Sequence, residues 1–242
     1  MRKVLFFLLF FSFVSCAINK KPYSIAIDKS WYATALNGQS NNLNGFIADV
    51  LLEIAKIKKI EISLIDANWD SIYDGLYKNQ YQAIFSIIEP YNFNVAKFDF
   101  SKDFLKTGYV LVVAKDSKYT SLKDMKQTHV GYLTGDRSIL ILQKNKEIFD
   151  EEYVSIPMML DDIKKLRIEG AVLSVIPGYR YVADLYQNDL KIIYPILDDQ
   201  SIKIITLKNQ NQKLMGILNS GLEELEKNHT LEKLKEKWGL PH

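Results

Sequence analysis

Charged side chains directly follow several of the apolar runs that predict buried strands. Glu89 comes after the apolar run 83–88, and Asp28 ends the alternating run 23–27. Carboxyl ends of parallel strands meet at one edge of an α/β sheet, where ligands bind, so both carboxylates are candidates to hold a cation or a hydrogen-bond donor. The alternatives are a turn residue facing water for Glu89 and a cap of the following turn for Asp28.

An anion site is predicted in the turn Gly135-Asp136-Arg137-Ser138, just before a predicted helix. Free backbone N–H groups at a helix start attract anions, and the Arg137 guanidinium could add a bidentate contact to a carboxylate. Asp136 would repel the same anion unless its carboxylate points away. The alternative is that Arg137 is a solvated charge at the helix start.

Aromatic side chains gather in the segments between these elements. Trp31 and Tyr32 lie in the first loop, Trp69 precedes a short predicted helix, and Tyr91 follows Glu89. Flat rings stack on planar groups or hold an ammonium by cation–π attraction, so these residues are candidates to line a binding cleft. Packing within the surrounding domain is the alternative for each.

The composition excludes several classes of protein. The 242 residues carry 31 basic and 29 acidic side chains, and this ordinary globular balance gives no reason to expect a nucleic-acid partner. A single cysteine excludes an internal disulfide, and the histidines, His129, His229 and His242, lack the spacing of zinc ligands. The sequence contains no P-loop, dinucleotide fingerprint or nucleophile elbow, so we expect neither a metal nor a cofactor.

The amino terminus has the pattern of an export signal. Arg2 and Lys3 precede the largely apolar run 4–14, which is too short to cross a bilayer but typical of a secretory signal. Cys16 follows this run in a context that resembles a bacterial lipoprotein signal. We therefore expect residues 1–15 to be removed and Cys16 to carry a lipid that anchors the protein to a membrane. Simple cleavage without a lipid is the alternative.

Hydrophobic spacing predicts two successive α/β series followed by a terminal segment. The first contains strands at 23–27, 60–64 and 83–88, a helix across 46–57 and a short helix across 72–77 capped by Asp70. The second contains strands at 109–114, 130–133, 154–156 and 171–176, helices across 138–143 and 160–166, and a helix opened by Pro177. A strand at 202–207 and two helices follow, the last capped by Thr230 and ending near Trp238. Two α/β lobes with parallel strands fit this order better than one.

Several short sequence words occur in an order and spacing that extend over the mature chain. They are Gly45-Phe46-Ile47-Ala48-Asp49, Trp69-Asp70-Ser71-Ile72, Phe100-Ser101, Thr107-Gly108, Ser121-Leu122-Lys123-Asp124-Met125, Val130-Gly131-Tyr132-Leu133-Thr134-Gly135 and Glu236-Lys237-Trp238-Gly239. Together they resemble the family 3 extracytoplasmic solute-binding proteins, the amino-acid-binding receptors of bacterial ABC importers. Each word is weak alone, and the resemblance depends on their combination.

This resemblance implies a fold class and a domain organisation. The fold is α/β and two-lobed, of the periplasmic-binding-protein-like type II, with each lobe a mostly parallel sheet flanked by helices. One lobe comprises residues 20–107 and 197–242 and the other residues 108–196, so the chain crosses twice and forms a hinge. The ligand binds in the cleft, and the lobes close over it because closure adds contacts to the ligand.

Two positions depart from the pattern that the resemblance implies for an α-amino-acid receptor. Such proteins hold the carboxylate with an arginine in a Thr-x-x-Arg turn and the ammonium with an aspartate after a late strand. Here Glu89 and Asn92 stand at the threonine and arginine positions, and Val175, or Ser174 if the alignment shifts by one residue, stands at the aspartate. An unpaired charge in a dry cleft is costly, so an ordinary α-amino acid is disfavoured unless its charges are recognised differently.

We therefore expect a monomeric solute-binding protein, not an enzyme, that delivers a small polar solute to an ABC permease. Its expected location is the periplasm or the outer face of a membrane. Two alternatives stay open: an enzyme similar to the periplasmic cyclohexadienyl dehydratases with Glu89 as general acid, and an interaction or sensory module without a transport role. The predicted ligand-binding residues are Asp28, Trp31, Tyr32, Trp69, Ser86, Glu89, Asn92, Asp136, Arg137 and Ser174.

Overall fold

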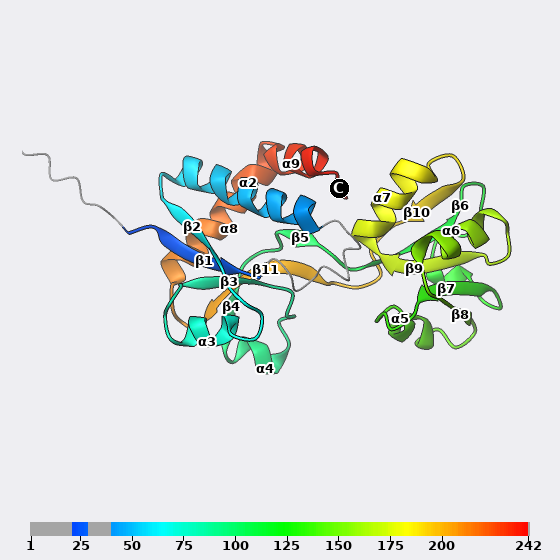
Figure 1. The fold of residues 1–242 in the computed structure, drawn as a ribbon, viewed down its shortest axis with the longest axis horizontal. Coiled ribbons are helices and arrows are strands. Elements are labelled where there is room, and N and C mark those ends of the chain that lie inside the picture. Colours follow the sequence, from blue (N-terminus) through cyan, green and yellow to red (C-terminus); the bar gives the residue numbers. More distant parts are fainter. Residues whose placement is uncertain (1–20, 29–39, 242) are drawn as a thin grey trace, which may run out of the picture.

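The computed structural model describes residues 21–28 and 40–241, which form two β-sheets flanked by helices (Figure 1). The first sheet contains β1 (Tyr23–Ile27), β2 (Ile62–Asp66), β3 (Ala83–Ser86), β4 (Phe98–Phe100), β5 (Leu105–Lys106) and β11 (Ser201–Leu207). Its helices are α2 (Ser40–Lys58), α3 (Ile72–Tyr77), α4 (Asn92–Val95), α8 (Gln212–Lys227) and α9 (Thr230–Trp238). We call this half lobe 1.

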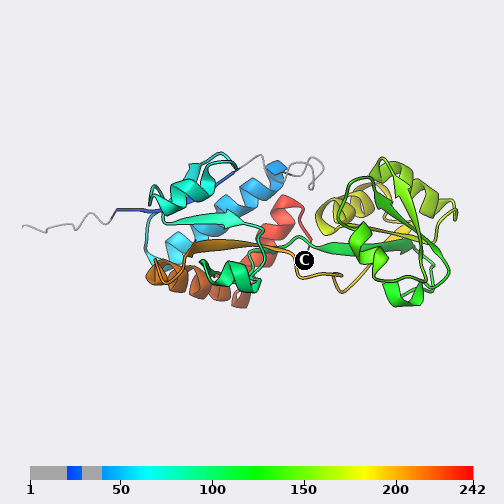
Figure 2. The same ribbon diagram turned by 90° about the horizontal axis from the view of Figure 1, so that it is seen from below.

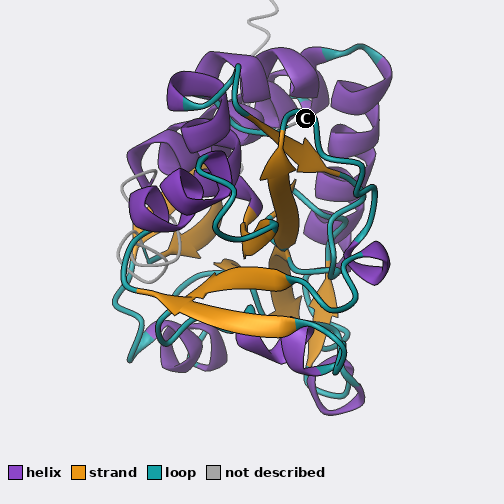
Figure 3. Ribbon diagram, turned by 90° about the vertical axis from the view of Figure 1, so that its right-hand side faces the viewer, coloured by secondary structure: helices purple, strands orange, loops and turns teal. Residues whose placement is uncertain are grey.

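The second sheet lies in the other half of the molecule, which we call lobe 2. It contains β6 (Tyr109–Ala114), β7 (His129–Leu133), β8 (Phe149–Tyr153), β9 (Gly170–Ser174) and β10 (Leu190–Ile193). Its helices are α5 (Ile139–Gln143), α6 (Ile156–Lys164) and α7 (Val175–Leu185), with a 3-10 turn at Leu122–Asp124. Viewed along the long axis, helices lie on both sides of the strands, as expected for an α/β fold (Figure 3).

Both sheets combine parallel and antiparallel strands. The strand order is β2-β1-β3-β11-β4 in lobe 1, with β5 paired to β11, and β10-β6-β9-β7-β8 in lobe 2. The expected parallel pairing is found for β2, β1 and β3 and for β8, β7 and β9. The strands β11 and β6, which directly follow the crossovers between lobes, pair with their neighbours in antiparallel orientation.

The chain passes twice between the lobes, and the two crossovers lie side by side at the narrow waist (Figure 2). The Thr107 N–H donates to the Gln200 carbonyl at 2.9 Å, and the Leu197 N–H donates to the Tyr109 carbonyl at 2.7 Å. These hydrogen bonds form a short two-stranded connection. A waist of two paired segments allows rotation of one lobe against the other, which is the geometry of a hinge.

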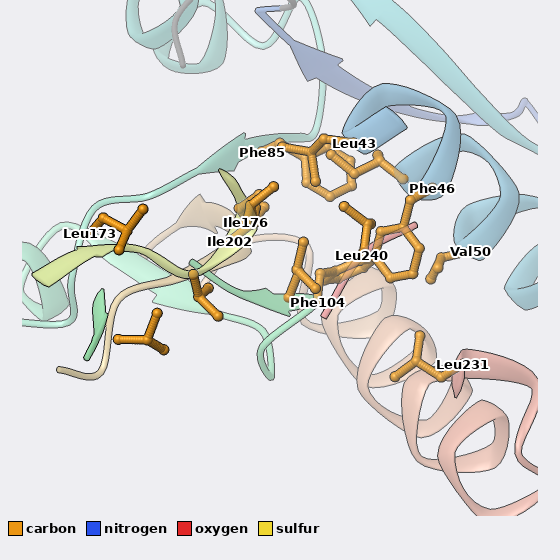
Figure 4. Packing of buried hydrophobic residues seen from close by; sticks show 14 of the residues in the cluster. Leu43, Phe46, Val50, Phe85, Phe104, Leu173, Ile176, Ile202, Leu231 and Leu240 are labelled. Carbon is orange, nitrogen blue, oxygen red and sulfur yellow. The ribbon is translucent and has the colours of Figure 1, made fainter. Parts of the chain in front are cut away.

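One apolar cluster contains buried residues of both lobes and so continues from one lobe into the other. It includes Phe46 of α2, Phe104 before β5, Ile202 of β11 and Ile176 of α7, all at most 1% exposed. Figure 4 shows these side chains with Leu240, which follows α9. The carboxyl-terminal residues of lobe 1 therefore pack at the waist, where they support the crossovers.

The structure corrects several predicted boundaries. The residue preceding α3 is Ser71 rather than Asp70, and the one preceding α9 is His229 rather than Thr230. The predicted strand at 154–156 is wrong, because β8 covers Phe149–Tyr153 and Ile156 already begins α6. Since β8 pairs only with β7 at the sheet edge, its charged side chains face solvent and leave no apolar alternation to detect.

Candidate functional site

A cavity of about 860 Å³ is lined by segments of both lobes and of the second crossover. Lobe 1 contributes Glu89 and Tyr91, lobe 2 contributes Tyr109 and Arg137, and the segment 193–200, which runs from the end of β10 into the second crossover, contributes a further part of the wall. This volume is in the range of small-molecule sites in proteins. The cavity brings together one carboxylate and one guanidinium that the sequence analysis singled out.

The carboxyl edge of the lobe 1 sheet carries several polar groups. Asp28 directly follows β1 and is 5% exposed, and Ser86 ends the adjacent parallel strand β3 and is fully buried. Lys203 of β11 is paired with Ser86 across the sheet and is also buried. The Ser86 hydroxyl lies 3.2 Å from the Tyr73 hydroxyl and accepts the Ile88 N–H at 3.1 Å. Sheet register therefore gathers buried polar side chains around the carboxyl end of β3, three residues before Glu89.

Glu89 and Lys203 form a buried ion pair at this edge. Lys203 Nζ lies 3.5 Å from Glu89 Oε2 and 3.4 Å from Asp103 Oδ1. It also donates to the Ser201 hydroxyl, which in turn donates to Asp103 Oδ1 at 2.8 Å. The Glu89 side chain is 15% exposed, and its second oxygen, Oε1, is buried without a hydrogen-bond partner among the described residues. Glu89 is thus not a solvated turn residue.

In lobe 2, Asp136 lies in the turn after β7 and its carboxylate binds within that turn. Its Oδ1 accepts the Ser138 N–H at 2.7 Å. Burial and the hydrogen bond to the Asp136 carboxylate raise the pKa of Tyr109 above its usual value. Asp136 is thus engaged with its own turn and with Tyr109, while the exposed Arg137 lines the cavity. The expected anion site on free N–H groups is not formed at Ser138, because Asp136 already occupies that donor.

At the hinge, an acidic side chain packs against the first crossover. Asp198 Oδ1 accepts the Tyr109 N–H at 3.1 Å, and burial raises the pKa of Asp198 above its usual value. A Cβ on Gly108 would lie 2.0 Å from the same oxygen. Glycine at this position is therefore what allows the two crossovers to approach each other.

Other predicted residues do not line the cavity. Trp69 is 40% exposed and packs edge-on against Tyr73, with ring centroids 5.8 Å apart. Asn92 is exposed at the start of α4. Ser174 is half-buried with its hydroxyl 3.5 Å from the Thr107 carbonyl, whereas Val175 is fully buried in the core. Of these two alternatives for the late-strand position, only Ser174 retains accessible surface.

Three predicted residues lie outside the described residues. They are Trp31 and Tyr32 of the first loop and Cys16 of the export signal. The described part of the chain holds no group of three or more His, Cys, Asp or Glu side chains arranged to bind a metal ion. Across the same residues, no helix combines the length and the apolar character needed to cross a bilayer.

Sequence reasoning missed Lys203, Asp103, Tyr109 and Asp198. Lys203 offered a detectable signal, because it interrupts an apolar strand whose other members are buried, and a lysine there needs a partner. Asp103 and Asp198 offered none, since an acidic residue in a connecting segment is usually solvated.

Comparison with known proteins identifies the family of the chain. The family model of bacterial extracellular solute-binding proteins, family 3, matches residues 23–241. The arginine-binding extracellular protein ArtP of Bacillus subtilis (strain 168) is 27% identical over 207 residues, which are 83% of this chain and 79% of that protein. The L-cystine-binding protein TcyJ of Escherichia coli (strain K12) is 22% identical over 217 residues, covering 88% of this chain and 81% of that protein.

Solved structures show the same fold. The L-cystine solute receptor of Neisseria gonorrhoeae, in an unliganded open conformation, matches with a TM-score of 0.73 and 18% identity, covering 91% of this chain and 93% of that chain. A substrate-binding domain of a putative amino acid ABC transporter from Streptococcus pneumoniae matches with a TM-score of 0.70 and 22% identity, covering 89% and 99%. With its two-lobed type II fold and a match over nearly all described residues, the chain belongs to the family 3 bacterial extracellular solute-binding proteins.

Proposed function

We propose that the protein is the extracytoplasmic solute-binding component of an ABC importer and that it binds an amino acid or a related small polar solute between its lobes. Residues 20–107 and 197–242 form one lobe of this receptor and residues 108–196 the other. The observation that carries the proposal is the cavity of about 860 Å³, which both lobes and a crossover line. The relatives named above bind arginine and L-cystine, which supports a solute of this class.

A thermal-shift screen tests this proposal. The purified protein is heated with single amino acids, L-cystine, short peptides, polyamines and organic acids. A ligand at 100 times its dissociation constant stabilises the folded state by about 2.7 kcal/mol, which gives a clear shift in Tm. If none of these solutes shifts the Tm, and calorimetry detects no binding, the proposal is wrong.

We also propose that binding takes place without chemistry. The named relatives are binding proteins, and Glu89, the acid suggested for a dehydratase, is held in an ion pair with Lys203. Because the Lys203 ammonium already engages one oxygen of this carboxylate, the arrangement does not suit a general acid. Turnover of prephenate or arogenate by the purified protein would contradict the proposal.

Anchoring through Cys16 completes the proposed role. A lipid on this thiol would hold the receptor at the outer face of the membrane, near its permease. Cells grown with labelled palmitate should incorporate the label into the wild-type chain and not into Cys16→Ser. Equal labelling of both chains, or of neither, would contradict lipidation at this residue.

A further inference from the structure

One carboxylate oxygen of Glu89, a residue that lines the cavity, lacks the donor that a buried polar atom normally has. Glu89 Oε1 is shielded from solvent, and no group among the described residues donates a hydrogen bond to it. Such an atom carries an unfavourable desolvation cost until a donor arrives. Because Glu89 lines the 860 Å³ cavity, a bound solute can supply that donor.

The charges around Glu89 determine what kind of donor fits. Lys203, with a side chain only 9% exposed, is shared between Glu89 and Asp103 at 3.5 and 3.4 Å. Two carboxylates and one ammonium leave a formal charge of −1 in this cluster. Asp103 is 41% exposed and can be solvated, whereas Glu89 is 15% exposed. Glu89 is therefore the less solvated of the two carboxylates and the one that lines the cavity, so a cationic donor is favoured over a neutral one there.

The rest of the cavity lining is compatible with a cation at this end. Tyr91 lines the cavity close in sequence to Glu89 and is 58% exposed, so its ring is available for cation–π contact. Arg137 lines the lobe 2 side, and its guanidinium makes no hydrogen bond or ion pair with a side chain of the described residues. A divalent metal ion would need several more oxygen ligands, which the described residues do not gather.

We propose that Glu89 Oε1 accepts a hydrogen bond from an ammonium or guanidinium group of the solute, so that the protein selects solutes with a cationic nitrogen. Lys203 and Asp103 are positioning residues: Lys203 contacts the other Glu89 oxygen, Asp103 contacts Lys203, and neither lines the cavity. Both crossovers end at this cluster, because Asp103 precedes β5 and Ser201 begins β11. The inference rests on the proposed solute-binding function and names the chemistry of its ligand.

Isothermal titration calorimetry with Glu89→Gln tests the inference. The probes are L-arginine, L-lysine, L-glutamine, L-cystine and putrescine, and each probe that binds is compared with an analogue that lacks one cationic nitrogen, such as L-citrulline or the N-acetyl derivative. We expect Glu89→Gln to weaken the bound probe about 10- to 100-fold, as for loss of a hydrogen bond to a charged group. The analogue that lacks the nitrogen bound by Glu89 should bind equally weakly to wild type and to Glu89→Gln, because the hydrogen bond to Glu89 is absent in both complexes.

Two further variants keep the test decisive. Glu223→Gln makes the same chemical change on the exposed face of α8, where Glu223 pairs with Lys102 at 2.6 Å, and should leave affinity unchanged. Glu89→Asp retains the charge but withdraws it by one methylene, so it should also weaken binding if Glu89→Gln does not fold. A probe that binds the Glu89 variants as tightly as wild type overturns this inference and leaves the solute-binding role standing. Absence of binding by every probe and every solute of the broader screen overturns both.

Discussion

Replacing Gly45 with alanine should destabilise lobe 1, because the indole of Trp238 occupies the space that a Cβ would need. A Cβ built at Gly45 in α2 would lie 2.2 Å from Cη2 of that ring and 2.4 Å from two other ring atoms. The ring is fixed in place: its Nε1 donates to Asp49 Oδ2 at 2.8 Å, and the Trp238 carbonyl accepts from Asn42 Nδ2 at 2.8 Å. The ring therefore cannot move aside without losing a hydrogen bond to a charged group.

The magnitude follows from three opposing contributions. Alanine in place of glycine inside a helix stabilises by about 1 kcal/mol. Overpacking a close contact costs about 1–3 kcal/mol. Weakening the hydrogen bond from Trp238 to the Asp49 carboxylate adds about 1 kcal/mol or more. We therefore expect Gly45→Ala to lower the free energy of unfolding by about 1–3 kcal/mol.

A matched glycine in the same lobe provides the control. Gly216 lies in α8, and no heavy atom of its surroundings would come within 4 Å of an added Cβ. Gly216→Ala should therefore stabilise the protein by about 0.5–1 kcal/mol, since only helix propensity and the entropy of the unfolded chain change. Urea unfolding, followed by far-UV circular dichroism, measures the stability of both variants. The dependence of the free energy of unfolding on urea concentration, the m-value, must agree with that of wild type before the free energies are compared.

A double-mutant cycle isolates the clash from other effects. In a Trp238→Ala background the space above Gly45 is empty, so Gly45→Ala should become neutral or stabilising. If Gly45→Ala and Gly216→Ala shift stability in the same direction and by the same amount, the packing of Trp238 on α2 is not as described. Retention of the full penalty in the Trp238→Ala background would lead to the same conclusion.

Two further predictions concern the hinge and an ion pair near the carboxyl terminus. Gly108→Ala would place a Cβ 2.0 Å from Asp198 Oδ1 and 2.9 Å from the Asp198 carbonyl oxygen. We therefore expect the free energy of unfolding, measured by thermal denaturation, to fall by about 1–3 kcal/mol and solute binding to weaken. Wild-type stability together with wild-type affinity would contradict the close approach of the crossovers. The hydrogen bond from Lys237 holds the pKa of the Asp49 carboxyl below the ordinary value of an aspartate. Because a lowered carboxyl pKa stabilises above the unfolded value and that stability is lost as pH falls through the folded one, Asp49→Asn should be less stable at pH 7 and lose less stability below pH ~4. Parallel stability–pH curves for wild type and Asp49→Asn would refute this role.

Local patterns in the sequence predicted most of the elements of the fold. The alternation in 23–27 and the apolar run 109–114 gave the bounds of β1 and β6, because strand residues alternate between two faces or are buried on both. The words around Gly45 and Trp238 predicted the family, and the structure shows why they occur together, since the indole packs on the glycine. The short strands β4, β5 and β10 were missed, because two to four residues are too few for a period to appear.

The candidate site depended on contacts that no local pattern encodes. Glu89 was identified from its place after a strand, but its partner Lys203 lies 114 residues further along the chain. Only the antiparallel register of β11 against β3, which pairs Lys203 with Ser86, brings the ammonium to the carboxylate. The direction of the Asp136 carboxylate toward Ser138 and Tyr109 was likewise decided by the folded turn. By itself, the sequence determined the type and order of elements, since these depend on neighbours within a few residues, and the tertiary structure decided which charges compensate each other, since electrostatic pairing depends on distance in space.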